Sequence, residues 1–228
     1  MLQTQRIHRP ADALQGLDFI LLTHQHSDHL DLDLLHGLQD FPILWVVPEF
    51  LLSRVQAGVD ISADRLIIPE PMRTIEIRGI KITPFDGLHW EVQPESQSLR
   101  GVPAMGYLVE FNGRRWLFPG DTRSYDASRL PSFGPVDVLF AHVWLGRGCA
   151  LQTTPPLLDA FCQFCVDLQP KHIVLTHLQD FGRDANDYWD SEHVQQITAL
   201  IAEKEPDIPI SSGLIGDRIA GLDYERIP

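Results

Sequence analysis

Positively charged side chains are scarce in this sequence of 228 residues. Lys and Arg together number 18 against 31 Asp and Glu, which gives a formal net charge of −13 at pH 7. Such a balance repels phosphate backbones and anionic membrane surfaces, because both are themselves negatively charged. We therefore expect no nucleic-acid partner, and RNA processing is disfavoured as an activity.

Long apolar runs and cysteines are also few. No apolar segment approaches the roughly 18 residues of a membrane-spanning helix, and the first residues lack the apolar stretch of a secretory signal. Three cysteines, an odd number, do not describe a disulfide framework in a chain of this length. We therefore expect a cytoplasmic protein with no membrane span. Cys162 and Cys165 have zinc-like spacing, but Cys165 belongs to the apolar stripe of a predicted helix, which favours core packing.

The composition is that of a globular protein, with 44% hydrophobic and 21% charged residues. No low-complexity segment or Ser/Gly-rich linker divides the chain, so we expect a single domain over residues 1–228. Strands expected between residues 73 and 118 follow one another without a long helix, whereas elsewhere strands and helices alternate. This order predicts an α/β fold with mixed sheets covered by helices.

Apolar runs and helical spacing give the expected elements. The expected strands are residues 18–22, 43–47, 66–68, 73–77, 79–83, 107–111, 115–118, 136–140, 172–175 and 208–210. The expected helices are residues 31–40, 49–57, 155–168 and 191–203, the last with Ser191 as its N-cap. Four of the strands end in metal-competent side chains, namely His24, Asp121, His142 and His177. The carboxyl ends of strands are where ligands bind in layered α/β folds.

The strongest motif follows the first expected strand and reads Thr23-His24-Gln25-His26-Ser27-Asp28-His29-Leu30-Asp31. Alternate positions 24 and 26 can point to one metal, while the turn directs Asp28 and His29 at a second. Imidazole and carboxylate donors suit zinc or iron. Lone loop histidines are usually solvated, but this spacing predicts a metal site. Asp31 has two open roles: it could accept the second N–H of a ligand imidazole, or begin the next helix.

Over roughly residues 17–180 the sequence resembles the metallo-β-lactamase superfamily. The later motifs of that family match His89 in Thr83-Pro84-Phe85-Asp86-Gly87-Leu88-His89, Asp121 in Phe118-Pro119-Gly120-Asp121-Thr122, and His177 after the strand expected at 172–175. The resemblance implies a four-layered αββα sandwich that holds metals at the top of its two sheets. It places His24, His26 and His89 on the first metal. It places Asp28, His29 and His177 on the second, with Asp121 between the two.

Within the superfamily, the His cluster together with His89-Trp90 and Gly106-Tyr107-Leu108-Val109-Glu110 is most similar to one branch. This branch contains the ascorbate-6-phosphate lactonases and the phospholipase D that acts on N-acyl phosphatidylethanolamines. The family's first sheet normally begins with two or three strands before the His cluster, whereas only about 17 residues precede the first strand here. We therefore expect a first sheet that is short at its N-terminal edge. An open strand edge favours pairing with another chain, which predicts a homo-oligomer.

The resemblance implies a dinuclear metal-dependent hydrolase with two divalent metals, zinc first and manganese or iron as alternatives. A metal-bridging hydroxide would cleave a small phosphorylated or acidic ester, a lactone or a phosphodiester. Asp28, Asp121 and His142 are the expected catalytic residues, although His142 could equally be a buried, hydrogen-bonded histidine. Two alternatives stay open: an iron-dependent sulfur dioxygenase of the same fold, and a non-enzymatic metal-binding interaction module.

Overall fold

The computed structural model describes residues 10–14, 16–92, 99–143, 157–178 and 191–213, together with residues 217 and 219. The chain divides into two compact units. One is His8–Ser132, and the other joins Phe133–Pro228 to Met1–Ile7. The single domain expected over residues 1–228 stays a prediction.

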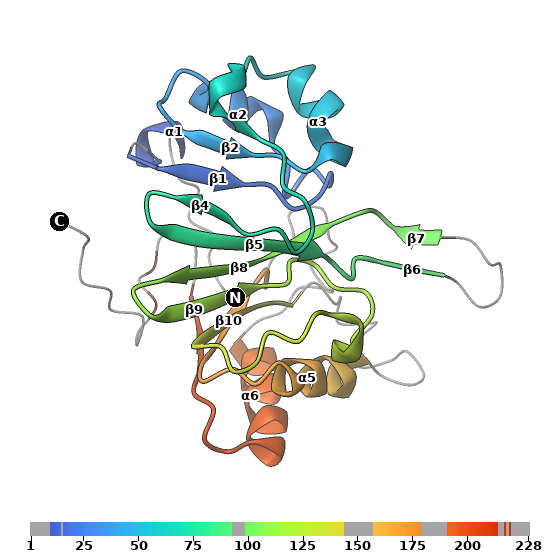
Figure 1. The fold of residues 1–228 in the computed structure, drawn as a ribbon. Coiled ribbons are helices and arrows are strands. Elements are labelled where there is room, and N and C mark those ends of the chain that lie inside the picture. The colour runs from blue at the N-terminus through green and yellow to red at the C-terminus, as the bar shows by residue number, and fades with distance from the viewer. Residues whose placement is uncertain are drawn as a thin grey trace. The chain divides into compact units, whose positions relative to one another are not determined.

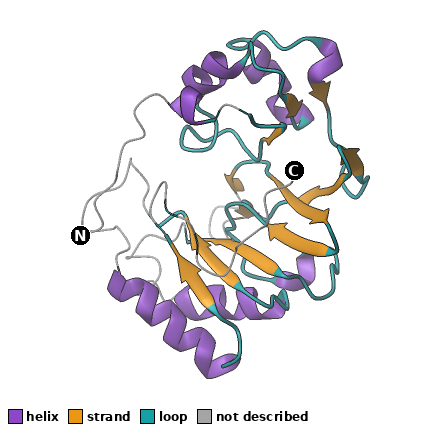
Figure 2. Ribbon diagram, turned by 90° about the vertical axis from the view of Figure 1, so that its left-hand side faces the viewer, coloured by secondary structure: helices purple, strands orange, loops and turns teal. Residues whose placement is uncertain are grey.

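The unit His8–Ser132 begins with the short helix α1 (Pro10–Ala13) and a three-stranded parallel sheet of β1 (Phe19–Leu21), β2 (Leu44–Val46) and β3 (Leu66–Ile67). The connections between these strands contain α2 (Leu32–Leu38), α3 (Glu49–Gln56) and the 3-10 turn η1 (Ala63–Arg65). Figure 2 shows the helices gathered on one side of the parallel strands. Leucine and valine side chains of α2 and α3 are buried with Trp45 in one hydrophobic cluster. Burial of this apolar stripe holds the helices on the sheet.

The same unit contains a second, antiparallel sheet in the order β9-β8-β5-β4. Its strands are β4 (Ile75–Ile77), β5 (Ile80–Asp86), β8 (Met105–Phe111) and β9 (Arg114–Phe118), as Figure 1 shows. Both of its tight hairpins turn through two residues with positive φ, Arg78-Gly79 and Asn112-Gly113. Such pairs are typical of type I′ turns, whose twist matches that of the strands. Val46 of the first sheet packs with Ile82 and Tyr107 of the second in one buried cluster, so the two sheets face each other.

A separate antiparallel pair consists of β6 (Trp90–Val92) and β7 (Leu99–Gly101). It lies between β5 and β8 in the sequence and extends away from the second sheet in Figure 1. The 3-10 turn η2 (Ala127–Arg129) follows β9. The structure thus gives this unit one helical layer and two sheet layers.

The unit that contains Phe133–Pro228 has three parallel strands in the order β12-β11-β10. They are β10 (Val138–His142), β11 (Ile173–Thr176) and β12 (Ile210–Ser212). The helices α5 (Leu157–Asp167) and α6 (Ser191–Lys204) lie side by side (Figure 1), and Lys204 of α6 forms an ion pair of 2.9 Å with Asp159 of α5. Helix α5 buries one stripe that includes Phe161, Cys162 and Cys165. Among the described residues, no helix is both long and apolar enough to span a membrane.

The expected strands and long helices are confirmed, with shifts of one to three residues at most ends. The sequence did not predict α1 or the β6–β7 pair, because these short segments carry neither an apolar run nor a helical period. Ser191 is the first residue of α6 rather than the residue before it. The described strands run in mixed directions and are connected by helices, as expected of an α/β fold, and the first sheet has three short strands in its described part.

The two cysteines of α5 are expected to resist thiol reagents in the native protein. Both side chains are fully buried, and burial raises the pKa of Cys162 to about 12 and that of Cys165 well above its usual range. Since the thiolate is the reacting form, modification should wait for unfolding. In the Cys149→Ser protein, a dithionitrobenzoate assay should detect both thiols in guanidinium chloride and almost none without it. Rapid labelling of the native protein would contradict the assigned core packing.

Candidate metal centre

The His-rich segment, residues 23–31, follows β1. Hydrogen bonds from both sheets of its unit hold it in place. The backbone N–H of Leu22 donates to the carbonyl of Val46 at 3.1 Å, and that of Met105 donates to the carbonyl of Thr23 at 3.0 Å. The hydroxyl of Tyr107, itself 1% exposed, donates to the carbonyl of Leu22 at 2.6 Å. The two residues before His24 are therefore fixed by β2 and β8, two strands that are distant in sequence.

A turn and a helix cap shape the rest of the segment. The backbone N–H of His29 donates to the carbonyl of His26 at 3.0 Å, which folds the chain back on itself. The carboxylate of Asp31 then accepts hydrogen bonds from the backbone N–H groups of residues 33 and 34 at 3.0 and 3.1 Å. Of the two roles that the sequence left open for Asp31, the structure shows the N-cap of α2.

Four of the predicted ligands form one compact group: His24, His26, His89 and Asp121 each offer an atom within 4.8 Å of the others. The Nδ1 atom of His26 lies 3.1 Å from His24 Nε2 and 3.0 Å from His89 Nε2. The Oδ2 atom of Asp121 lies 3.7 Å from His24 Nε2. His24, His89 and Asp121 are buried. The structure therefore brings together, from three segments, the three histidines that the resemblance placed on the first metal and the aspartate that it placed between the two.

The donor set of this group fits a divalent metal. Four donors at 2.0–2.1 Å around a tetrahedral zinc ion lie about 3.3–3.4 Å from one another, and the observed separations of 3.0, 3.1 and 3.7 Å bracket that value. Imidazole must be neutral to bind a metal. Burial lowers the pKa of His24 to about 3 and that of His89 to about 4, so both rings are neutral near pH 7.

Asp28 and His29 form a second group on the other side of Asp121. The Nε2 atom of His29 lies 3.3 Å from Asp121 Oδ2 and 3.4 Å from Asp28 Oδ2. Burial favours the neutral imidazole of His29, but hydrogen bonds with the carboxylates of Asp121 and Asp28 outweigh it and raise the pKa to about 9. Two carboxylates thus stabilise one positive charge here. This group therefore favours a bound cation. Asp121 Oδ2 faces both His24 and His29, so one oxygen serves both groups.

Backbone contacts fix His89, which lies between β5 and β6. The backbone N–H of Arg123 donates to the carbonyl of Leu88 at 2.7 Å, and that of Val102 donates to the carbonyl of His89 at 3.3 Å. Gly101, with a φ of +89°, has its α-carbon so close to His89 that a Cβ atom there would lie 1.9 Å from the His89 carbonyl oxygen. This close approach of β7 requires glycine at position 101.

Three supporting residues were missed by the sequence analysis: Thr23, Gly101 and Tyr107. The hydroxyl of Thr23 lies 3.0 Å from Nδ1 of His24, which leaves Nε2 of the same ring facing His26 and Asp121. A hydrogen bond to the remote ring nitrogen fixes the orientation and tautomer of a ligating histidine. Thr23 belongs to the quoted motif, but the sequence analysis gave it no role. A hydroxyl residue directly before a His-x-His pair is the pattern that could have indicated one.

Removal of the Tyr107 hydroxyl is expected to destabilise the fold. Tyr107→Phe leaves the Leu22 carbonyl without its 2.6 Å donor in a buried environment. The expected loss in the free energy of unfolding is about 1–2 kcal/mol. Urea denaturation of the two proteins measures it, and an unchanged free energy of unfolding would show that the bond does not hold the segment.

The two remaining predicted site residues, His142 and His177, belong to the unit with Phe133–Pro228. His142 ends β10 and His177 follows β11, and their rings are stacked with centroids 5.8 Å apart and an interplanar angle of 13°. His177 has a φ of +58°, which is uncommon for a residue other than glycine. The ligand role of His177 and the catalytic role of His142 stay predictions. Arg147 and Arg183, which follow β10 and β11 in the sequence and could contact a phosphate or carboxylate, lie outside the described residues.

Comparison with known families identifies the chain. The model of a family described as the beta-lactamase superfamily domain matches residues 1–178. This chain belongs to the β-lactamase superfamily. Its metallo-β-lactamase fold is confirmed, and so is the recognition of the family from the His-x-His-x-Asp-His motif. Comparison with curated proteins gives no match. The branch within the β-lactamase superfamily stays a prediction.

Solved structures share the superfamily fold. Igni18, a metallo hydrolase from the archaeon Ignicoccus hospitalis KIN4/I, is 14% identical with a TM-score of 0.62, over 91% of this chain and 80% of its own. YhfI from Bacillus subtilis, a metallo-beta-lactamase fold protein, is 16% identical with a TM-score of 0.60, over 92% and 79%. CmlA from Streptomyces venezuelae, a diiron beta-hydroxylase, is 17% identical with a TM-score of 0.55, over 85% and 43%. Because the match spans less than half of CmlA, it concerns one part of that protein.

Proposed function

We propose that this chain is a dinuclear metal-dependent hydrolase of small phosphorylated or acidic esters, lactones or phosphodiesters. One observation carries the proposal: the Oδ2 atom of Asp121 lies 3.7 Å from His24 Nε2 and 3.3 Å from His29 Nε2. A carboxylate shared between two donor groups supports a pair of neighbouring cations, because one negative charge then lies close to both. When bound, two divalent metals would lower the pKa of a water molecule toward neutrality and polarise the carbonyl or phosphoryl oxygen of the substrate.

Burial and charge indicate which residues would hold each metal. His24, His26 and His89 would hold the first metal, because two of these rings are buried and neutral and all three converge. Asp28 and His29 would hold the second, with Asp121 between the two. The side chain of Asp28 is 29% exposed, against 4% for Asp121. Asp28 is therefore the more exposed of the two carboxylates, and its oxygen that does not bind the metal is suited to accept a proton from the attacking water.

Imidazole and carboxylate donors also suit iron. CmlA, which shares the fold, is a diiron beta-hydroxylase. A dioxygenase would differ from a hydrolase in its need for oxygen, and an interaction module would bind metal without turnover. The predicted homo-oligomer and cytoplasmic location are further expectations for this proposed enzyme.

The proposal is tested on protein purified without added metal. Elemental analysis is expected to find close to two metal equivalents per chain after reconstitution with Zn²⁺ or Mn²⁺. The reconstituted protein is then assayed on a phosphodiester, a sugar lactone and glutathione persulfide, with and without oxygen. Hydrolysis that continues in the absence of oxygen supports the proposal. Oxygen consumption with Fe²⁺ and persulfide, without turnover of any ester or lactone, would replace it by the dioxygenase.

A further inference from the structure

The large hydrophobic side chains that are exposed among the described residues follow the carboxyl ends of two parallel strands. They are Phe50 at 40%, Ile68 at 45% and Met72 at 54% exposure, and we name these three residues the apolar rim. Phe50 follows β2 in the first turn of α3, and Ile68 directly follows β3. Because β1, β2 and β3 are parallel, the His-rich segment leaves β1 at the same edge of the sheet. The apolar rim and the metal ligands thus follow the same ends of these strands.

A backbone hydrogen bond connects Met72 to the second sheet near the metal centre. The N–H of Met72 donates to the carbonyl of Pro84 in β5 at 2.7 Å, and Pro84 precedes His89 by five residues. On the other side of β5 lies β8, whose first residue, Met105, donates its backbone N–H to the carbonyl of Thr23. Neighbouring strands are about 4.8 Å apart. The backbone of Met72 is therefore two strand spacings, about 10 Å, from the strand that holds the His-rich segment.

The backbone conformation at Met72 disfavours methionine. The N–H of Arg73 donates to the carbonyl of Glu70 at 3.1 Å and closes a turn with Pro71 and Met72 in its two central positions. Met72 has a φ of +63°. A turn with proline first and a positive φ second is typical of type II, in which glycine is favoured at the second central position. A side chain with a Cβ atom is disfavoured in this region of φ.

Packing within the protein does not compensate for this conformation. The Met72 side chain is 54% exposed, and the buried hydrophobic clusters of the described residues do not include it. Residues held in such a conformation are concentrated where proteins contact ligands. Methionine is flexible and polarisable, which suits contact with apolar groups of varied shape. The structure therefore accounts for methionine at position 72 by contact with a ligand, and by neither the turn nor the core.

The size of the apolar rim favours a small molecule over a protein partner. The three side chains together expose on the order of 250 Å², when a large side chain is taken to expose roughly 150–250 Å² in full. A stable protein interface buries about 800 Å² on each partner. An acyl chain or an aryl ring of a small molecule needs far less.

We propose that the apolar rim contacts an acyl chain or aryl group of the substrate, with Met72 as the residue that sets the preference for it. This inference rests on the proposed hydrolase function and narrows its substrates to esters or lactones that carry such a group. The metal centre would hold the polar end of the substrate, and the apolar rim its apolar end. Each methylene group that leaves water for this surface should strengthen binding, up to about fourfold.

The test uses NMR on protein with isotope-labelled methionine methyl groups, in zinc-loaded and chelator-treated form. The sequence has three methionines, and Met72→Leu identifies the resonance of position 72. Octanoate is expected to shift this resonance saturably in both forms. In the zinc-loaded form it should bind at least tenfold more tightly than acetate, which has the same carboxylate and no long chain. Met105, 3% exposed, is the internal reference for a buried methyl group.

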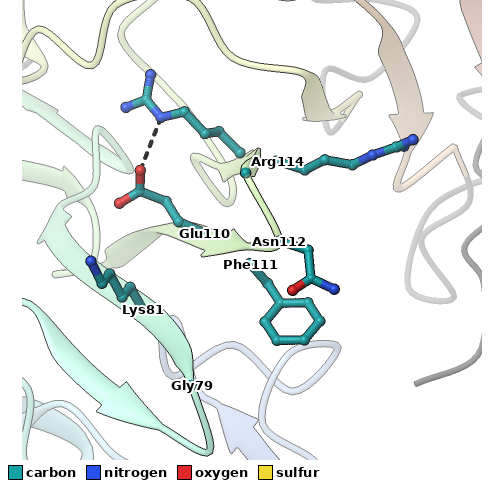
Figure 3. A pocket seen from close by; sticks show the side chains of 8 residues that line it. Gly79, Lys81, Glu110, Phe111, Asn112 and Arg114 are labelled. Carbon is teal, nitrogen blue, oxygen red and sulfur yellow. Dashed lines mark hydrogen bonds and ion pairs between the residues drawn. The ribbon is translucent and has the colours of Figure 1, made fainter. Parts of the chain in front are cut away.

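Met72→Gly and Asn112→Gly separate the side-chain contact from the backbone strain. Both residues are exposed and have positive φ, +63° and +49°, so glycine should not lower the urea midpoint of unfolding in either. Asn112 lies in the turn between β8 and β9, at the opposite end of the sheet from the metal centre, beside a pocket of ≈ 340 Å³ (Figure 3). Met72→Gly is expected to reduce the preference for octanoate over acetate at least threefold, and Asn112→Gly to leave it unchanged.

Binding and hydrolysis are measured separately, so each can fail alone. If the reconstituted protein hydrolyses no ester or lactone while the preference for octanoate depends on Met72, the proposed reaction is wrong and the apolar site is supported. Equal affinity for acetate and octanoate, or a preference that persists in Met72→Gly, would overturn the role of the apolar rim whether or not hydrolysis is found. A Met72 resonance that shifts with protein concentration in the absence of octanoate would replace the substrate by a second copy of this chain.

Discussion

Replacement of Asp121 by alanine is expected to remove most of the bound metal and to lower kcat/KM more than about 100-fold. The Oδ2 atom of this buried carboxylate faces His24 on one side and His29 on the other, so its loss opens both donor groups at once. Loss of a residue that merely supports a ligand costs about 10–100-fold in metal affinity or activity, and removal of a shared ligand should cost more. Elemental analysis and steady-state kinetics on whichever ester or lactone the wild-type protein hydrolyses measure the two effects.

Asp31→Ala is the matched control, because it removes a carboxylate that ends the His-rich segment but that caps α2. The Asp31 side chain caps α2 and is exposed, so its loss should lower the free energy of unfolding by about 1 kcal/mol. Metal content should stay at the wild-type value. Full metal content together with full activity in the Asp121→Ala protein would exclude Asp121 as a shared ligand.

The half of the site that is local in sequence could be predicted from the residues themselves. His24, His26, Asp28 and His29 lie within six positions directly after an apolar strand, and a turn suffices to bring them together. His89 and Asp121 could be assigned through the family resemblance alone. A single histidine or a Gly-Asp pair carries no local signal that the ends of β5 and β9 meet the end of β1.

The groups that hold the ligands in place were harder to predict than the ligands. Tyr107 lies within an apolar strand and reads as a core residue, and its hydrogen-bond acceptor is a backbone carbonyl 85 positions earlier. The β6–β7 pair has three residues per strand, and its register depends on the approach of Gly101 to His89. Neither property follows a period in the sequence. Strand and helix patterns predict where elements lie, whereas contacts between distant backbones require the fold.

Gly101→Ala is expected to destabilise the protein and to reduce its metal content. An added Cβ atom would lie 1.9 Å from the carbonyl oxygen and 2.9 Å from the carbonyl carbon of His89, and 3.0 Å from Cδ of Arg123. Because the nearest atoms are backbone, a rotamer change cannot relieve the clash, and either β7 or the segment at His89 must move. Overpacking of this kind typically costs about 1–3 kcal/mol, and the positive φ adds about 1–2 kcal/mol for any residue with a Cβ atom. Displacement of His89 would also remove one imidazole from the first donor group.

Gly16→Ala separates the steric clash from the backbone strain. Gly16 has the same φ of +89°, but a Cβ atom added there would meet no atom within 4 Å. Its alanine variant should therefore lose only the conformational term, about 1–2 kcal/mol, and keep its full metal content. Urea denaturation and elemental analysis of the two variants measure both quantities. If Gly101→Ala matched Gly16→Ala in stability and in bound metal, the contact between β7 and His89 would have no part in building the site; a larger loss of both at position 101 would show that this backbone approach sets the place of His89.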